Sequence, residues 1–271
     1  MAFGPLVETD WLRKHLRDGG VRVIDFRWYL QGRNGRDEYE RGHLPGAVFV
    51  DLEDVTGREG AGRHPLPTPS QFEHEMRRAG VDPNTKVVAY DDAGGSVAAR
   101  LWFLLGLFGH RAQAVLDGGL QAWGTPLETE VPRVQAGAFK SRRTHDPRLL
   151  DFEAVRALRG IPLIDARAGE RYRGEKEPVD PKAGHIPGAL SAPFSENLGP
   201  DGRFKSPLEL RRRYEALGAE NGAVFYCGSG VNATHHLLAM EIAGLPNAGL
   251  YAGAWSDWSR RDAPVATGEQ P

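Results

Sequence analysis

The chain contains one cysteine, Cys227, and its sequence surroundings favour nucleophilic chemistry. It follows the apolar run 223–226 and opens the sequence CGSGVN, after which comes the stretch ATHHLLAMEIAG. This order predicts a buried strand, a glycine-rich loop and a helix, with the thiol at the carboxyl end of the strand, where open α/β sheets bind ligands. Loop glycines let backbone N–H groups turn towards a ligand, and the helix N-terminus adds partial positive charge. Both features favour the thiolate, the reactive form of cysteine.

Other roles for a single cysteine make different demands on the sequence. A cysteine phosphatase needs an arginine six positions after the cysteine to clamp phosphate, and that position is Ala233. A thioredoxin-like dithiol and a cysteine-rich zinc site both need further cysteines, which the sequence lacks. We therefore expect no metal at Cys227. A buried structural cysteine stays open as the alternative.

Four sequence blocks occur twice in the same order, about half a chain apart, which indicates two duplicated domains. They pair VRVIDFRW with IPLIDARA, ERGHLPGAVFV with KAGHIPGALSA, KVVAY with AVFYC, and DGGLQAW with AGAWSDW. In this alignment Asp91 stands where the second half has Cys227, and His43 is in register with His185. A carboxylate repels anions and cannot carry transferable sulfur. We therefore expect the first half to be catalytically silent.

Each half alternates short apolar runs with helical patterns, which predicts an α/β fold with a parallel sheet and helices on both faces. Helices are expected to begin at Thr9, at Ser70 and at Ser206-Pro207, because each of these positions offers a capping hydroxyl before a helical pattern. The expected strands are 21–24, 86–90, 114–116, 162–164, 223–226 and 249–251.

The segment 131–147 is polar and basic, contains Pro, Gly and Ser, and has no clear period. These properties are typical of a linker. We therefore expect an N-terminal domain at 1–130 and a C-terminal domain at 148–271, which carries Cys227.

The bulk composition excludes several classes of partner. The 34 basic and 36 acidic residues nearly balance at a formal charge of −2, so nothing indicates nucleic acid. Apolar runs such as 104–108 are too short to cross a bilayer, and the start of the sequence lacks the apolar core of a secretory signal. We therefore expect no membrane partner and a location in the reducing cytoplasm.

The two GH(L/I)PGA blocks, the CGSGV loop, DGGLQAW and AWSDW together resemble the tandem rhodanese family of thiosulfate and 3-mercaptopyruvate sulfurtransferases. The resemblance covers nearly the whole chain. It implies two tandem rhodanese-like domains and an enzyme whose cysteine takes sulfur from a small anionic donor, becoming a persulfide. It also implies that cyanide, a thiol or thioredoxin accepts the sulfur, and that no metal or organic cofactor is needed.

The resemblance also assigns roles to individual residues. The uncharged Gly228-Ser229-Gly230 is similar to the mercaptopyruvate type, in which Ser229 and His43 would assist Cys227. His43 has a structural turn residue as its alternative role, because His185 occupies the same slot of the other half. The acid that completes this group has no clear counterpart; the best-aligned position is Asn34, with Asp37 close by. The resemblance places the donor against Gly228, Gly230, Val231 and Asn232, where Asn232 replaces the usual Thr and is expected to hydrogen-bond the loop.

Binding an anionic donor needs positive charge. Arg171 matches the family's first substrate arginine, whereas the position of the second arginine is Val179. Lys205 or Arg173 are the candidates to replace it. The alternatives to this interpretation are a sulfur carrier that uses thiosulfate alone and a non-catalytic binding or regulatory module of the same fold.

Overall fold

The computed structural model describes residues 3–142 and 146–271 and divides into two compact units. The first unit comprises Met1–Gly57, Pro67–His145 and Pro200–Phe204, and the second comprises Arg58–Leu66, Asp146–Gly199 and Lys205–Pro271. The segment Arg58–Leu66 therefore lies early in the sequence but belongs to the second unit. The limits 1–130 and 148–271 stay a prediction, and they put this segment in the other half.

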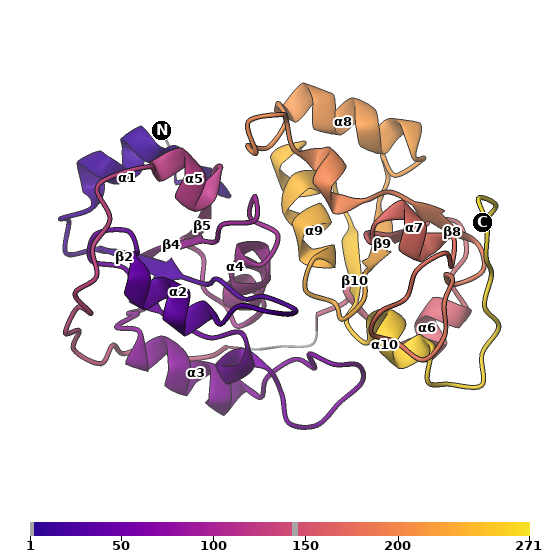
Figure 1. Cartoon of the computed structure of the whole chain (residues 1–271), viewed down its shortest axis with the longest axis horizontal. Helices are drawn as coiled ribbons and strands as arrows, with labels where there is room; N and C mark the ends of the chain where they lie inside the picture. Colours follow the sequence, from indigo (N-terminus) through magenta and orange to yellow (C-terminus); the bar gives the residue numbers. More distant parts are fainter. Residues whose placement is uncertain (1–2, 143–145) are drawn as a thin grey trace. The chain divides into compact units, whose positions relative to one another are not determined.

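Within the described residues, the first unit is built on a five-stranded parallel sheet in the order β1-β5-β4-β2-β3 (Figure 1). Leu12 and Trp123 pack from their helices against Val88 and Tyr90 of the sheet. The strands are β1 (Leu6–Val7), β2 (Val21–Asp25), β3 (Val48–Phe49), β4 (Lys86–Tyr90) and β5 (Gln113–Leu116). The helices are α1 (Thr9–His15), α2 (Gly35–Arg41), α3 (Pro69–Arg78), α4 (Ala98–Leu107) and α5 (Gly119–Trp123), with a 3₁₀ turn η1 (Glu53–Val55).

The second unit repeats this plan in the order β6-β10-β9-β7-β8, so each strand has a counterpart at the same place in the first sheet. The strands are β6 (Leu149–Leu150), β7 (Leu163–Asp165), β8 (Ala189–Ser191), β9 (Ala223–Tyr226) and β10 (Ala248–Tyr251). The helices are α6 (Phe152–Arg156), α7 (Gly169–Tyr172), α8 (Pro207–Ala216), α9 (Ala233–Ile242) and α10 (Ala254–Trp258), with a 3₁₀ turn η2 (Phe194–Asn197). The repeated order confirms the α/β class and the duplication.

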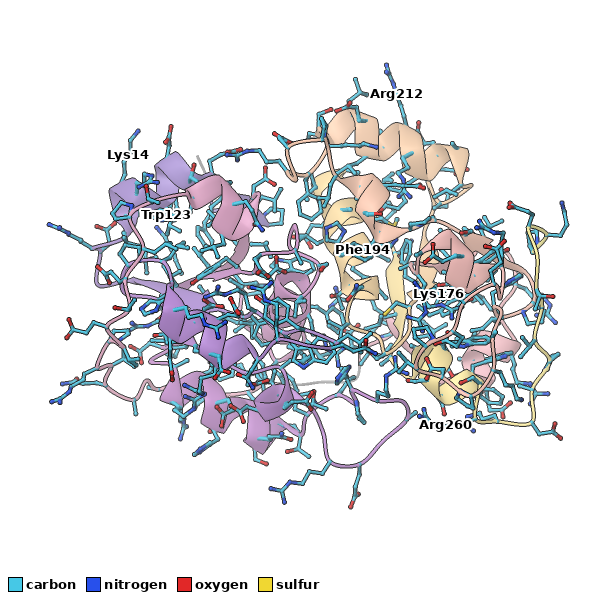
Figure 2. The ribbon with its side chains drawn as sticks, viewed as in Figure 1. Lys14, Trp123, Lys176, Phe194, Arg212 and Arg260 are labelled. Carbon is cyan, nitrogen blue, oxygen red and sulfur yellow. The ribbon has the colours of Figure 1, made fainter. Side chains whose placement is uncertain are left out.

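The central strand β9 is buried on both of its faces. Val224 and Tyr226 point into a cluster that includes Trp255 of α10. Phe225 points the other way, where it stacks on His236 of α9 at 4.8 Å between ring centroids. The outer face of α8 turns to solvent, as Arg212 shows in Figure 2. Because helices cover both faces of β9, a ligand reaches this strand only at its ends, and Cys227 follows its carboxyl end.

The aspartates that close the first apolar run of each half have a structural role. Asp165 at the end of β7 pairs with Arg167 at 2.6 Å, and Asp25 at the end of β2 pairs with Arg27 at 2.7 Å. All four side chains are buried. Each pair is hydrogen-bonded through several atoms, which compensates for the removal of both charges from water.

The sequence-based helix starts are partly right. Ser206 caps α8 with a reciprocal capping box to Glu209, as expected. The cap of α3 is Thr68 rather than Ser70, because Pro69 fits the first helical position. Helix α1 begins at Thr9 as expected, but its N-cap residue is Glu8, which makes no capping bond, so Thr9 does not cap the helix. The edge strands β1, β3, β6 and β8 have two or three residues each, too few to show a period.

No helix among the described residues is both long and apolar enough to cross a membrane.

Candidate active site

Cys227 lies in the loop between β9 and α9, and 4% of its surface is exposed. Its Sγ accepts a hydrogen bond from the backbone N–H of Gly230 at 3.1 Å. A donated N–H stabilises a negative charge on sulfur more than it stabilises a neutral thiol. The loop therefore presents a backbone N–H donor to the sulfur at the carboxyl end of β9, where the sequence predicts the thiol.

The backbone of this loop is hydrogen-bonded to α10. The N–H groups of Trp255 and Ser256 donate to the carbonyls of Cys227 and Gly228, each at 2.9 Å. These bonds use the loop carbonyls. Gly230 has φ +79°, and a Cβ there would lie 2.6 Å from the carbonyl oxygen of Ala252. Only glycine therefore fits this position.

The remaining predicted loop residues have different surroundings. Val231 is buried, and its carbonyl accepts a bond from the hydroxyl of Thr234 at 2.6 Å. Asn232 is the N-cap residue of α9, but its side chain makes no capping hydrogen bond within the described structure. The expectation that Asn232 would hydrogen-bond the loop was therefore wrong. Thr234 ties the start of the helix to the loop instead.

Ser229 has a histidine partner, which is His64 rather than His43. The hydroxyl Oγ of Ser229 lies 2.8 Å from Nδ1 of His64, and both residues are buried. His64 comes from the segment Arg58–Leu66 of the second unit. A hydroxyl that shares a hydrogen bond with an imidazole can take up or release a proton. The pair therefore places proton-transfer chemistry two residues from the sulfur.

His43 has a structural role, which corrects its assignment as the partner of Ser229. Its ring is fully buried and stacks on Tyr39 at 4.0 Å. Nδ1 lies 2.8 Å from the carbonyl of Tyr39, and Nε2 lies 3.3 Å from that of Glu130. His185 repeats the arrangement by stacking on Tyr172 at 3.7 Å with Nδ1 2.8 Å from its carbonyl. In both halves the histidine of the GH(L/I)PGA motif therefore stabilises the turn by stacking on a tyrosine and hydrogen-bonding its backbone carbonyl.

A second repeated motif could have pointed to His64. The sequence GRH at 62–64 recurs as GRF at 202–204. The first of these segments belongs to the second unit, whereas the second belongs to the first unit. The match is only three residues long and ends in unlike side chains, so it does not stand out beside the longer blocks.

Arg171 of α7 lies against the loop. A Cβ on Gly228 would lie 3.4 Å from Nη1 of Arg171. The guanidinium pairs with Glu177 at 2.6 Å and with Asp180 at 3.5 Å. Burial opposes ionisation of Glu177, but the N–H of Asp180 and the charge of Arg171 outweigh it, so the pKa of Glu177 is lowered. Arg171 is therefore fixed in place by its ion pairs with Glu177 and Asp180.

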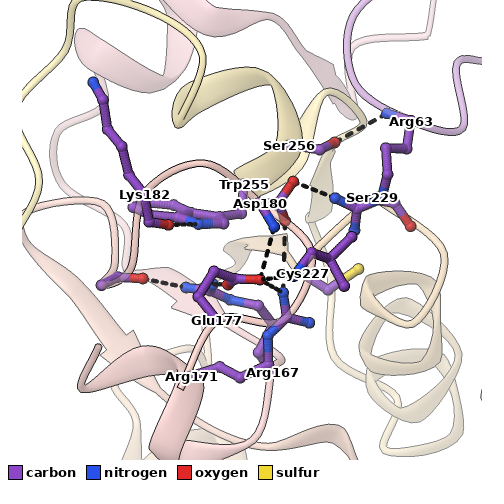
Figure 3. Close-up of polar contacts among 12 residues, drawn as sticks. Arg63, Arg167, Arg171, Glu177, Asp180, Lys182, Cys227, Ser229, Trp255 and Ser256 are labelled. Atoms are coloured by element: carbon purple, nitrogen blue, oxygen red, sulfur yellow. Dashed lines mark hydrogen bonds and ion pairs between the residues drawn. The ribbon is translucent and has the colours of Figure 1, made fainter. Parts of the chain in front are cut away.

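The two candidates for a second cation are engaged elsewhere. Lys205 donates to the carbonyl of Glu196 at 2.7 Å, and Arg173 pairs with Glu175 at 2.7 Å. Val179 contributes only its N–H, which donates to Glu177. Arg63 is the other guanidinium beside the loop. It pairs with Asp180, and Figure 3 shows this carboxylate between Arg63 and Arg171.

In the counterpart loop of the first unit, the side chain of Asp91 occupies the backbone N–H groups. Asp91 is buried, and its carboxylate accepts four backbone N–H bonds at 2.8–2.9 Å, from Ala93, Gly95, Val97 and Ala98. This loop therefore shows that the architecture gathers N–H groups around a carboxylate, whose pKa is raised by burial. It also explains why the first unit has no nucleophile at this place.

No group of three or more His, Cys, Asp or Glu side chains with the arrangement of a metal site occurs in residues 3–142 and 146–271. The chemistry described here uses only side chains and backbone N–H groups.

Comparison with known proteins agrees with this geometry. The model of the rhodanese-like domain matches residues 8–125 and 150–261. A probable 3-mercaptopyruvate sulfurtransferase of Pseudomonas aeruginosa is 42% identical over 99% of this chain and 100% of its own. The thiosulfate sulfurtransferase of Rattus norvegicus is 35% identical over 96% and 93%. The crystal structure of SseA from Escherichia coli, a 3-mercaptopyruvate enzyme, superposes with a TM-score of 0.83 at 33% identity, covering 93% of this chain and 99% of that one.

Proposed function

The chain belongs to the tandem rhodanese family and is a sulfurtransferase, and we propose that it carries sulfur from 3-mercaptopyruvate as a persulfide on Cys227. The observation that supports this most is the set of groups around the thiol. Gly230 donates an N–H to the sulfur, Ser229 and His64 form a hydrogen-bonded pair, and Arg171 lies against the same loop.

In the first step the Cys227 thiolate attacks the sulfur of 3-mercaptopyruvate. A sulfur–sulfur bond forms while the carbon–sulfur bond of the donor breaks, and its electron pair stays on carbon as the enolate of pyruvate. The enolate takes up a proton and leaves as pyruvate. Sulfur is oxidised and carbon is reduced in the same step, so no external oxidant is needed.

The Ser229–His64 pair fits the proton requirements of this step. The hydroxyl of Ser229 can donate to the carbonyl oxygen of the donor, where negative charge develops, and His64 can restore the proton. Thiosulfate has no such carbonyl, so the pair favours mercaptopyruvate as the donor. Arg171 binds the donor carboxylate.

In the second step an acceptor nucleophile attacks the outer sulfur of the persulfide and releases the Cys227 thiolate. We propose cyanide, a small thiol or reduced thioredoxin as acceptors, because each is a soft nucleophile. A free catalytic thiol and a thiol acceptor both require reducing surroundings, which the cytoplasm offers.

Replacing the nucleophile tests the proposal. We expect Cys227→Ser to lower thiocyanate formation from cyanide about a thousandfold or more with either donor, because a hydroxyl does not form a persulfide. Thermal unfolding of the variant checks that it folds. Turnover retained in folded Cys227→Ser contradicts the proposed mechanism. In the unmodified enzyme, we expect kcat/KM for 3-mercaptopyruvate to exceed that for thiosulfate, and the reverse order would identify a thiosulfate enzyme.

A further inference from the structure

We propose that Arg63 is a second donor-binding residue, which together with Arg171 holds the anionic group of the donor above Gly228. This inference rests on the proposed function of Cys227 and names the cation that the sequence lacks at Val179.

The charge balance of the buried cluster calls for a further cation. Three carboxylates and two guanidinium groups form a continuous set of ion pairs beside the loop. The formal charge of this set is 2 − 3 = −1, which repels an anionic donor. Arg63 pairs with Asp180 and offsets this charge, and the exposed Arg260 lies 4.0 Å from the same carboxylate. The members of the set are Asp165, Arg167, Arg171, Glu177 and Asp180.

The position of Arg63 faces the donor side of the loop. Its pairing with Asp180 uses Nη1, whereas Nη2 lies 3.0 Å from where a Cβ on Gly228 would be. The nearest guanidinium nitrogen of Arg171 lies 3.4 Å from the same point. Two guanidinium groups therefore flank the residue that follows Cys227. A side chain on Gly228 would crowd both of them.

Both guanidinium groups keep bonding capacity. Their Nε atoms are buried, and neither has a hydrogen-bond partner among the described residues. A buried donor without a partner is unfavourable, and an anion that shifts the two side chains towards itself would relieve this cost. The fork of a guanidinium matches the paired oxygens of a carboxylate, so two forks can grip one donor from both sides.

The segment that carries Arg63 is rigidly placed. The N–H of Arg63 donates to Oγ of Ser256 at 3.0 Å. The preceding Gly62 has φ +82°, and a Cβ there would lie 2.4 Å from the carbonyl oxygen of Gly253. The backbone at these positions is thus fixed on the turn before α10. The adjacent residues Arg63 and His64 therefore place a guanidinium beside Gly228 and an imidazole against Ser229.

Steady-state kinetics of Arg63→Gln, with Arg63→Lys and Arg58→Gln beside it, test this inference. Glutamine keeps most of the length and removes the charge, and lysine keeps the charge without the fork. Arg58 is an exposed arginine of the same segment and serves as the control. Rates are normalised to the folded fraction of each variant, measured by thermal unfolding, so loss of folded protein does not count.

We expect Arg63→Gln to raise the KM for 3-mercaptopyruvate about tenfold to a hundredfold. Its KM for cyanide should not change, Arg63→Lys should lie between, and Arg58→Gln should match the unmodified enzyme. An unchanged donor KM in Arg63→Gln, or an equal loss in Arg58→Gln, overturns the role of Arg63. If Arg63→Gln does not fold, an unchanged donor KM in Arg63→Lys overturns the role of the fork. The proposed function fails separately, when the unmodified enzyme gains no sulfur from either donor.

Discussion

Asp91 and Cys227 occupy the same place in two loops of the same architecture. The two side chains interact differently with the backbone N–H groups of their loops. The carboxylate of Asp91 accepts hydrogen bonds from four backbone N–H groups of its own loop. The smaller sulfur of Cys227 accepts one N–H bond, from Gly230. The two loops therefore differ in how many backbone N–H groups their own side chain uses.

A comparison of two histidines tests the correction from His43 to His64. We expect His64→Gln to lower kcat with 3-mercaptopyruvate about a hundredfold, because Ser229 loses its proton partner. We expect His43→Gln to leave kcat unchanged and to lower the free energy of unfolding by about 1–3 kcal/mol, since its buried ring stacks on Tyr39 and hydrogen-bonds a backbone carbonyl. Kinetics and chemical denaturation measure the two effects. The opposite pattern would return the catalytic role to His43.

The elements that position the site could be predicted unevenly from the sequence. The β9–loop–α9 unit was predictable because an apolar run, paired glycines and an apolar helix follow one another without interruption. Arg171 was found by resemblance, and the structure puts it beside Gly228. His64 and Arg63 were not found, because their segment has no helical or strand period and belongs to the unit distant in sequence. Local patterns fix elements, whereas such long-range placement depends on tertiary contacts.

Helix α9 also contains a buried histidine whose protonation affects stability. Burial, reinforced by the charges of Arg213 and His235, lowers the pKa of His236 well below its usual 6.5. Its Nε2 lies 3.0 Å from the carbonyl of Ala192, and Nδ1 lies 2.9 Å from the hydroxyl of Tyr214. The carbonyl requires a proton on Nε2, which leaves Nδ1 as the acceptor of the neutral ring.

This lowered pKa predicts a loss of stability in acid. The unfolded chain binds a proton on His236 below about pH 6.5, whereas the folded chain does not. The contribution of this group is therefore complete above pH 6.5 and declines as the pH falls below it. Urea denaturation between pH 5 and pH 8 (about the range in which histidine titrates) measures the slope. We expect a shallower acid decline in His236→Gln than in the unmodified protein; equal slopes contradict the assignment.

At the scale of the whole molecule, one architecture is used twice with different results. Both sheets have the same strand order, and in both units the histidine of the GH(L/I)PGA motif stacks on a tyrosine ring. Each unit also includes a short segment from the other half of the sequence, 58–66 in one and 200–204 in the other. The first of these supplies His64 and Arg63 to the site, and the second offers Phe204 at the equivalent place of its motif. Duplication kept the scaffold, while the single cysteine of the sequence lies in the second half.

Intact-mass measurement after incubation with 3-mercaptopyruvate tests the central claim most directly. The account predicts that each chain gains the mass of one sulfur atom, that peptide mapping places it on Cys227, and that cyanide removes it. Cys227→Ser should gain none. A chain that gains no sulfur from either 3-mercaptopyruvate or thiosulfate, or a Cys227→Ser variant that still gains it, would contradict the account.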